Sequence, residues 1–422
     1  MATLGDIVNP EVVSSALESA GVASARDAAL TLERAWPYRR LPLVALYRED
    51  GGAPGRWWTV AALPGGPFPG ALKRGLKNGR AVAVPSLNAV LQRFPDDVEL
   101  HGLAEATDSS LARERLAPWL DADFEARSVE AEPIGYKPMR RFVARYRFVS
   151  RDGTEQTLFG KCFRPGADEE SWSAHSALAH TMHGQPPPEP NVAPPEGRIP
   201  EWKMLVWRRA PGKPFLQLLE DADATSVAER IGAALAALHR SDVAWQRRHT
   251  TADELSTVWR WIELAKRVFP HSAPRLDRAC EELIRLTHDP SPSRLRPSHR
   301  DFYDKQVLVH GEKMTFLDLD TACLAEPELD LGNFLAHLRL RRLQRPQLRT
   351  DEVGNALIEG YVARTGPPDR RRLHFYEGCA ITRLACVYAF RPRWRGLASE
   401  LLEEALTSIS DKARQGRTVH AI

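Results

Sequence analysis

The chain has 422 residues, of which 43% are hydrophobic and 27% charged, and its formal net charge is +3. This length predicts two or three lobes with sizeable cores, and the near balance of charge argues against a nucleic-acid or membrane partner. The five cysteines are scattered and form no CxxC pair, so neither a disulfide framework nor a zinc site is expected. No apolar run reaches membrane-spanning length and no signal peptide is visible, so we expect a cytoplasmic protein.

Residues 1–125 form one compositional unit, which we expect to be an N-terminal cap or accessory region. A helical pattern over 10–20 is followed by runs rich in β-branched and aromatic residues at 42–47 and 57–61, which predict strands. This region contains no recognisable catalytic motif.

The next part of the chain reads as consecutive antiparallel strands. Over 141–149 apolar side chains alternate with basic ones, as in a strand with one buried face. Asp152-Gly153 predicts a hairpin turn and 157–163 the returning strand. A helix is predicted over 168–182 and a further strand over 203–207.

The rest of the chain is mostly helical by pattern, for example over 222–239, 251–268 and 351–365. Strands first, and then helices around a short hairpin, predict a two-lobed α+β protein.

The most informative stretch runs from His299 to Asp330. Asp301 lies in an expected loop, Gln306 follows five positions later at the start of a strand, and a second strand is expected to end on Asp318. This arrangement can place one carboxylate beside a hydroxyl nucleophile, and an amide plus a second carboxylate around a magnesium ion. The pattern predicts phosphoryl transfer, but it does not reveal the acceptor.

The order and spacing of these motifs resemble the aminoglycoside phosphotransferase-like branch of the protein-kinase-like superfamily, over roughly residues 128–410. Several motifs in the right order are specific, whereas any one of them alone is weak. The resemblance rests on His299-Arg300-Asp301 followed by Gln306, on Leu317-Asp318, and on Pro327-Glu328-Leu329-Asp330-Leu331.

This resemblance implies an α+β, protein-kinase-like bilobal fold. Residues 126–208 would form an N-lobe built on an antiparallel sheet, and 209–422 a mainly helical catalytic C-lobe. Residues 1–125 would then be an extra N-terminal α/β region.

The same resemblance implies roles for the motif residues. Asp301 would accept the proton of the acceptor hydroxyl, while His299 and Asp330 would support the loop by packing and hydrogen bonds. Gln306 and Asp318 would bind Mg²⁺, and Asp318 would bridge the metal to the nucleotide phosphates. Many relatives have Asn at the position of Gln306, but maltokinase-like members carry Gln, so this departure does not exclude activity.

Asp320 follows Asp318 by two residues and, if both lie on a strand, points the same way. It is either a second metal-side or substrate-side carboxylate or a structural partner, and the sequence leaves these alternatives open.

In the N-lobe, the resemblance implies that Lys161 binds the nucleotide phosphates. Its partner would be Glu170, although capping of the helix N-terminus explains this acid equally well. No GxGxxG motif precedes Lys161. The turn at 135–141 is rich in basic residues instead, and it either meets phosphate or forms a basic strand edge.

Met204, Val206 and Trp207 fall where the resemblance places the hinge between the lobes. Their backbone groups would meet the adenine ring.

The predicted activity is ATP-dependent transfer of the γ-phosphate to a hydroxyl group of a sugar, amino sugar or aminoglycoside-like small molecule, with ATP and Mg²⁺ as cofactors. The alternative is a non-catalytic nucleotide-binding scaffold, against which the joint presence of Lys161, Asp301 and Asp318 argues. A protein kinase is less expected, because the segment between Asp318 and Asp330 is too short for an activation loop and no Ala-Pro-Glu motif occurs. The sequence does not reveal the oligomeric state.

Overall fold

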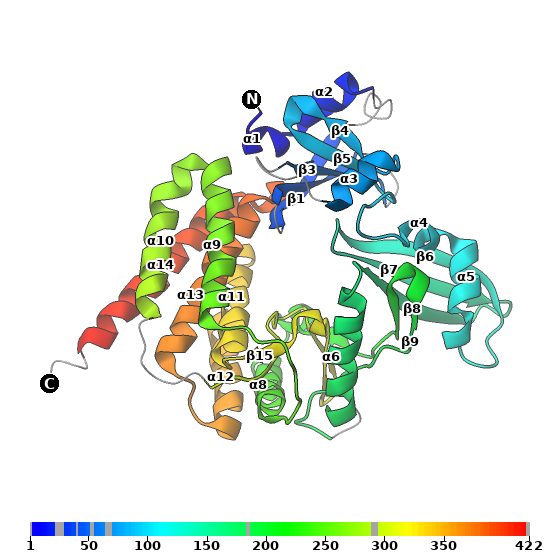
Figure 1. The fold of residues 1–422 in the computed structure, drawn as a ribbon. Helices are drawn as coiled ribbons and strands as arrows, with labels where there is room; N and C mark the ends of the chain where they lie inside the picture. The colour runs from blue at the N-terminus through cyan, green and yellow to red at the C-terminus, as the bar shows by residue number, and fades with distance from the viewer. Residues whose placement is uncertain are drawn as a thin grey trace. The chain divides into compact units, whose positions relative to one another are not determined.

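The computed structural model describes residues 2–21, 29–38, 41–50, 55–63, 70–182, 186–287 and 294–418. The chain is divided into two compact units, and Figure 1 shows their helices and strands. The first unit comprises Met1–Trp172, Pro195–Arg209 and Phe390–Pro392, and the second comprises Ser173–Pro194, Ala210–Ala389 and Arg393–Ile422.

The first unit contains two five-stranded antiparallel sheets, the first of which has the order β1-β2-β3-β5-β4. The strands predicted at 42–47 and 57–61 are confirmed as β2 (Leu41–Glu49) and β3 (Trp57–Ala62), and the side chains of β3 are all buried. The other elements here are α1 (Leu4–Ile7), α2 (Pro10–Ser19), β1 (Leu30–Tyr38), α3 (Gly70–Lys77), β4 (Val82–Val84) and β5 (Ala89–Arg93).

The second sheet has the order β6-β7-β8-β10-β9. The alternation predicted for β7 (Arg141–Ser150) is confirmed, since Phe142, Tyr146 and Phe148 are fully buried. Gly160 on β8 has no room for a side chain, because a Cβ there would lie 2.5 Å from the Met204 sulfur. The other elements are α4 (Leu103–Thr107), α5 (Ser109–Leu116), β6 (Ala126–Lys137), β8 (Glu155–Phe163), β9 (Gly197–Ile199) and β10 (Met204–Arg208). Helix α6 (Ala167–Met182) begins in the first unit and continues in the second.

Residues of the N-terminal region fix the turn between β6 and β7. Met139 in this turn has a left-handed backbone with φ 59°. Its carbonyl oxygen accepts from the Tyr38 hydroxyl (2.7 Å), and its N–H donates to Asp97 Oδ2 (2.8 Å). Asp97 also accepts a hydrogen bond from the Tyr136 hydroxyl (2.8 Å). The main-chain oxygen of Tyr136 in turn accepts from Arg34 Nη2 (2.6 Å). Both polar backbone groups of Met139 are therefore held from outside the second sheet.

The second unit is built mainly on long helices. Glycines allow two of them, α8 and α12, to pack in close contact. A Cβ on Gly360 would lie 1.9 Å from the Glu229 oxygen, and one on Gly232 would lie 2.0 Å from the Leu357 oxygen. Glycine is therefore required at both positions. The helices are α7 (Phe215–Leu218), α8 (Ala224–Arg240), α9 (Thr251–Val268), α10 (Ala273–Leu286), α11 (Glu328–Gln344), α12 (Thr350–Thr365), α13 (Arg370–Ala389) and α14 (Gly396–Thr418).

The helix predicted over 251–268 is confirmed as α9, which begins with a reciprocal cap between Thr250 and Asp253. α13 packs against both α11 and α14 (Figure 1). In the part of the chain that the structure describes, no helix has the length and apolar character needed to cross a membrane. Two small sheets complete the unit: β11 (Lys213–Pro214), β13 (Val307–His310) and β14 (Lys313–Phe316) form one, and β12 (Arg296–Ser298) and β15 (Cys323–Ala325) form the other.

The strand expected to end on Asp318 stops earlier. β14 ends at Phe316, Asp318 has a left-handed backbone with φ 59°, and Leu319–Thr321 form a 3₁₀-helix. The expectation that Asp318 and Asp320 share one face of a strand is therefore wrong. Aspartate tolerates the left-handed conformation better than most residues, and this allows the chain to leave the strand at this point.

Candidate active site

The loop that contains Asp301 connects β12 to β13 and is anchored by a buried aromatic residue. Phe302 is fully buried, and its ring lies 4.9 Å from that of Phe316 and 5.4 Å from that of Phe334. β12 also pairs with β15, which brings the segment after Asp318 beside the start of this loop. The loop is thus fixed at its centre and at its entry.

The Asp301 side chain is half-buried. Its main-chain N–H donates to His299 Nδ1 (3.3 Å), but its carboxylate has no ion pair or hydrogen bond with any residue that the structure describes. An unpaired carboxylate on a fixed loop is suited to accept a hydrogen bond or a proton from a substrate hydroxyl.

His299 uses both of its ring nitrogens within the protein. Nε2 donates to the Leu317 carbonyl oxygen (2.7 Å), so Nδ1 is the acceptor for the Asp301 N–H. The ring therefore links the loop to the residue that precedes Asp318. Both ring nitrogens are thus engaged within the protein.

Asp330 binds the same loop from the first turn of α11. Its carboxylate is fully buried and accepts the N–H of His299 (2.7 Å) and of Arg300 (2.6 Å), and it lies 3.1 Å from His239 Nε2. Arg300 has a left-handed backbone with φ 70°, which costs about 1–3 kcal/mol in a non-glycine residue. Hydrogen bonds to a charged acceptor contribute about 1.5–3 kcal/mol each and offset this strain.

One face of α11 carries a polar stripe that was not identified from the sequence. Its members are spaced by three or four residues, so they line up on a helix. Polar residues that recur at this spacing after Asp330 were the available signal. Asn333 Nδ2 donates to the Phe302 oxygen (2.8 Å), the His337 ring stacks on Tyr303 at 4.1 Å, and Arg341 pairs with Asp304.

The ion pair between Arg341 and Asp304 is buried and bidentate. Arg341 Nε lies 2.5 Å from Asp304 Oδ2, and Nη2 lies 3.0 Å from Oδ1. Burial by itself lowers the pKa of Arg341, but the hydrogen bonds and the charge attraction to Asp304, together with the nearby tyrosines Tyr388 and Tyr303, raise it overall. Asp304 is therefore neutralised by a partner, whereas Asp301, three residues earlier, is not.

Gln306 and Asp318 offer oxygen ligands at adjacent places. The Gln306 main-chain oxygen accepts the N–H of Leu317 (2.9 Å), the residue before Asp318. The Gln306 side-chain amide makes no hydrogen bond to the residues in the described ranges. Carboxylate and amide oxygens suit Mg²⁺, which is commonly held by one or two side chains together with phosphates and water.

Among the described residues, no group of three or more His, Cys, Asp and Glu side chains is arranged to hold a metal ion.

Lys161 lies on β8, between β7 and β10 in the sheet of the first unit, and is 9% exposed. Glu170 lies in the first turn of α6 and is exposed. The buried polar residues of that helix are Asp168, Ser171 and His175, which share one face. This face was not predicted from the sequence, because a glutamate was expected as the functional residue of this helix.

The proposed hinge residues lie on β10, where Met204 and Val206 are buried and Trp207 is half-exposed. β9 pairs with Met204–Val206, and the Val206 oxygen accepts the Glu196 N–H (2.7 Å). The ladder on this side therefore ends at Val206. The backbone of Trp207 lies beyond the pairing with β9.

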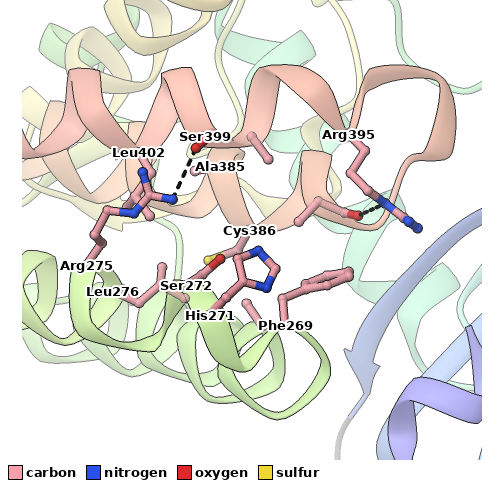
Figure 2. A pocket seen from close by; sticks show the side chains of 13 residues that line it. Phe269, His271, Ser272, Arg275, Leu276, Ala385, Cys386, Arg395, Ser399 and Leu402 are labelled. Carbon is pink, nitrogen blue, oxygen red and sulfur yellow. Dashed lines mark hydrogen bonds between the residues drawn. The ribbon is translucent and has the colours of Figure 1, made fainter.

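Figure 2 shows a cavity of about 120 Å³ in the helical unit, lined by residues of α9, α10, α13 and α14. At its rim, Arg275 Nη2 donates to Ser399 Oγ (3.1 Å) (Figure 2). No residue of the loop around Asp301 lines this cavity. It is separate from the candidate active site.

Comparison with protein families identifies the chain. The model of the phosphotransferase enzyme family matches residues 140–376, more than half of the chain. The chain belongs to this family. This phosphotransferase is therefore an enzyme that acts on hydroxyl groups, and the predicted reaction class is confirmed. A search of curated protein sequences found no match.

Two solved structures resemble the phosphotransferase in fold. One is a candidate aminoglycoside phosphotransferase from Ralstonia eutropha, with a TM-score of 0.53 and 17% identity, over 72% of this chain and 98% of that one. The other is a spectinomycin phosphotransferase solved with ADP and spectinomycin, with a TM-score of 0.51 and 14% identity, over 72% of this chain and 97% of that one. The predicted protein-kinase-like α+β fold is confirmed.

Proposed function

We propose that the phosphotransferase transfers the γ-phosphate of ATP to a hydroxyl group of a sugar, an amino sugar or an aminoglycoside-like molecule. The observation that carries this proposal is the Asp301 carboxylate, which lies on a fixed loop and has no partner among the described residues. Arg341 neutralises the neighbouring Asp304, so the site leaves one carboxylate available to a substrate. Family membership and the likeness to a spectinomycin phosphotransferase support the acceptor class.

In this proposal Asp301 orients the acceptor hydroxyl and takes its proton as the phosphoryl group transfers. Gln306 and Asp318 hold Mg²⁺, which supplies neutralisation of the phosphate charge when it is bound. Asp320 either adds a second carboxylate on the metal or substrate side or acts structurally.

The nucleotide is held by the first unit. Lys161 contacts its phosphates, and Glu170 is a weaker candidate for a supporting role because it is exposed. The β6–β7 turn around Met139 also faces the phosphates. The backbone at Trp207 meets the adenine, since β9 already pairs with Met204–Val206.

The test is a screen of sugars, amino sugars and aminoglycosides for ATP consumption, followed by kinetics of Asp301→Asn with the best acceptor. Loss of a positioned base lowers turnover by roughly 10²–10⁴-fold. ATP affinity is expected to stay constant, because the proposed phosphate contacts are elsewhere. Asp242→Asn, at an exposed aspartate of the same unit, is the matched control and should be silent.

Two results would redirect the proposal. Unchanged turnover in Asp301→Asn would remove its catalytic role, and a large loss of ATP binding would make Asp301 structural. Binding of ATP without turnover of any acceptor would favour the nucleotide-binding scaffold. Asp320→Asn, measured in the same assay, separates the two roles left open for that residue.

A further inference from the structure

A second cavity of about 750 Å³ lies in the helical unit, away from the proposed catalytic and metal residues. It is formed by the C-terminal ends of α8 and α12, the N-terminal ends of α11 and α13, and Arg294 and Arg296 at the start of β12. Its volume falls in the range of about 300–1,000 Å³ that is typical of small-molecule sites.

The lining of this cavity is rich in arginine, and most of these arginines have no acidic partner. Arg294, Arg296 and Arg364 make no ion pair or side-chain hydrogen bond with the residues that the structure describes. The Arg240 side chain donates to the Arg364 main-chain oxygen (3.4 Å) and makes no other hydrogen bond or ion pair with the described residues. Arg372, the fifth, is paired with Glu326.

The two acids of the lining are engaged with backbone groups. Glu328 is 8% exposed and accepts the N–H of Asp369 (3.0 Å), and burial raises its pKa. Asp369 Oδ1 accepts the N–H groups of Arg371 (2.9 Å) and Arg372 (3.0 Å) at the start of α13. The acids therefore leave the cavity with a surplus of positive charge.

Guanidinium groups that gather around one concave surface repel each other, and the field inside such a surface favours an anion. The planar fork of arginine matches the oxygens of phosphate groups. We propose that this cavity binds a small anion that carries a diphosphate or longer polyphosphate group.

A hydrogen bond joins the wall of the cavity to Asp330, which supports the Asp301 loop. His239 and Tyr361 both line the cavity, and their side chains lie 2.9 Å apart through His239 Nδ1 and the tyrosine hydroxyl. His239 Nε2 lies 3.1 Å from Asp330 Oδ2, the carboxylate that holds the N–H groups of His299 and Arg300. A ligand that immobilises this wall therefore also tightens the loop.

The test is calorimetric titration of the full chain with inorganic tripolyphosphate at fixed ionic strength and without Mg²⁺. The double variant Arg296→Gln/Arg364→Gln is expected to bind more than tenfold more weakly than the parent, because two charge-assisted contacts are lost. The matched control is Arg285→Gln/Arg349→Gln, which removes the same charge from exposed arginines that pair with Glu282 and Glu352, each three residues away. This control should bind like the parent.

Lys161→Met removes the proposed phosphate contact of the nucleotide site and should keep the tripolyphosphate binding that the cavity variant loses. Hydrogen exchange at the amides of His299 and Arg300 should slow when tripolyphosphate is added to the parent, but not to the cavity variant. The proposal is overturned if the parent does not bind, if the cavity variant and its control bind equally, or if Lys161→Met abolishes binding.

Discussion

Tyr38 and Tyr47 form a natural pair for testing how the N-terminal region acts on the proposed phosphate-binding turn. Both are buried on the first sheet, and both donate their hydroxyl to a main-chain oxygen. Tyr38 donates to Met139 in the β6–β7 turn (2.7 Å), whereas Tyr47 donates to Ile7 (2.6 Å). Tyr38→Phe and Tyr47→Phe thus remove the same chemical group at two places, of which one touches the turn.

The two substitutions should cost similar stability. Each removes a neutral hydrogen bond, of about 0.5–1.5 kcal/mol, and leaves a buried carbonyl unsatisfied, at about 1–3 kcal/mol. In Tyr38→Phe the loss falls on Met139, whose left-handed backbone stores about 1–3 kcal/mol of strain. Without this hydrogen bond, the backbone of Met139 can leave its strained conformation, and the turn changes shape. Since a free energy of 1.4 kcal/mol corresponds to a factor of ten, we expect ATP affinity to fall by up to about tenfold in Tyr38→Phe.

The assays are thermal melting, calorimetric titration with ATP, and hydrogen exchange over residues 136–141. Both variants should melt a few degrees below the parent, since about 1 kcal/mol shifts the melting temperature by about 2–4 °C in a unit of this size. Weaker ATP binding and faster exchange in the turn should appear in Tyr38→Phe and be absent in Tyr47→Phe. Equal ATP affinities in the two variants would refute the reasoning.

Three further substitutions test the site itself. Asp330→Asn places an amide N–H₂ against main-chain N–H donors, so exchange at His299 and Arg300 should accelerate; unchanged exchange would contradict the role of Asp330. Asp318→Asn keeps a residue that tolerates φ 59° but removes the charge, so the thermal stabilisation by magnesium-ATP should disappear while the melting temperature without ligand stays close to that of the parent. Arg341→Ala leaves Asp304 buried and unpaired, and denaturant unfolding should show a loss of about 3–5 kcal/mol. Asp304→Asn in the same background should recover part of this loss, and failure to do so would mean that the unpaired charge is not its cause.

Local pattern was sufficient to predict much of this fold. The alternation in β7 and the helical spacing in α9 both reflect burial of one face, which the sequence records directly. The loop residues from His299 to Gln306 are also close in sequence, so their order carried the motif. For these segments, the determinants of structure lie within a few residues of one another.

The support of the loop was less visible, because it depends on contacts distant in sequence. Asn333 and Arg341 reach Phe302 and Asp304 over more than thirty residues, and nothing in the local pattern names these partners. The error at Asp320 has a local cause. A left-handed residue at Asp318 ends the strand geometry on which the prediction of a shared face relied.

The contrast between Asp301 and Asp304 bears on whether the loop is catalytic or only structural. Withdrawing a carboxylate from water is costly unless it is paired, and at Asp304 the protein meets this requirement with a bidentate arginine. At Asp301 it supplies no such partner among the described residues, although the loop is anchored on both sides by Phe302 and His299. A scaffold would gain stability from a neutral residue at this position. A half-buried carboxylate without a partner among the described residues keeps its oxygens available to accept a hydrogen bond from a ligand, such as an acceptor hydroxyl.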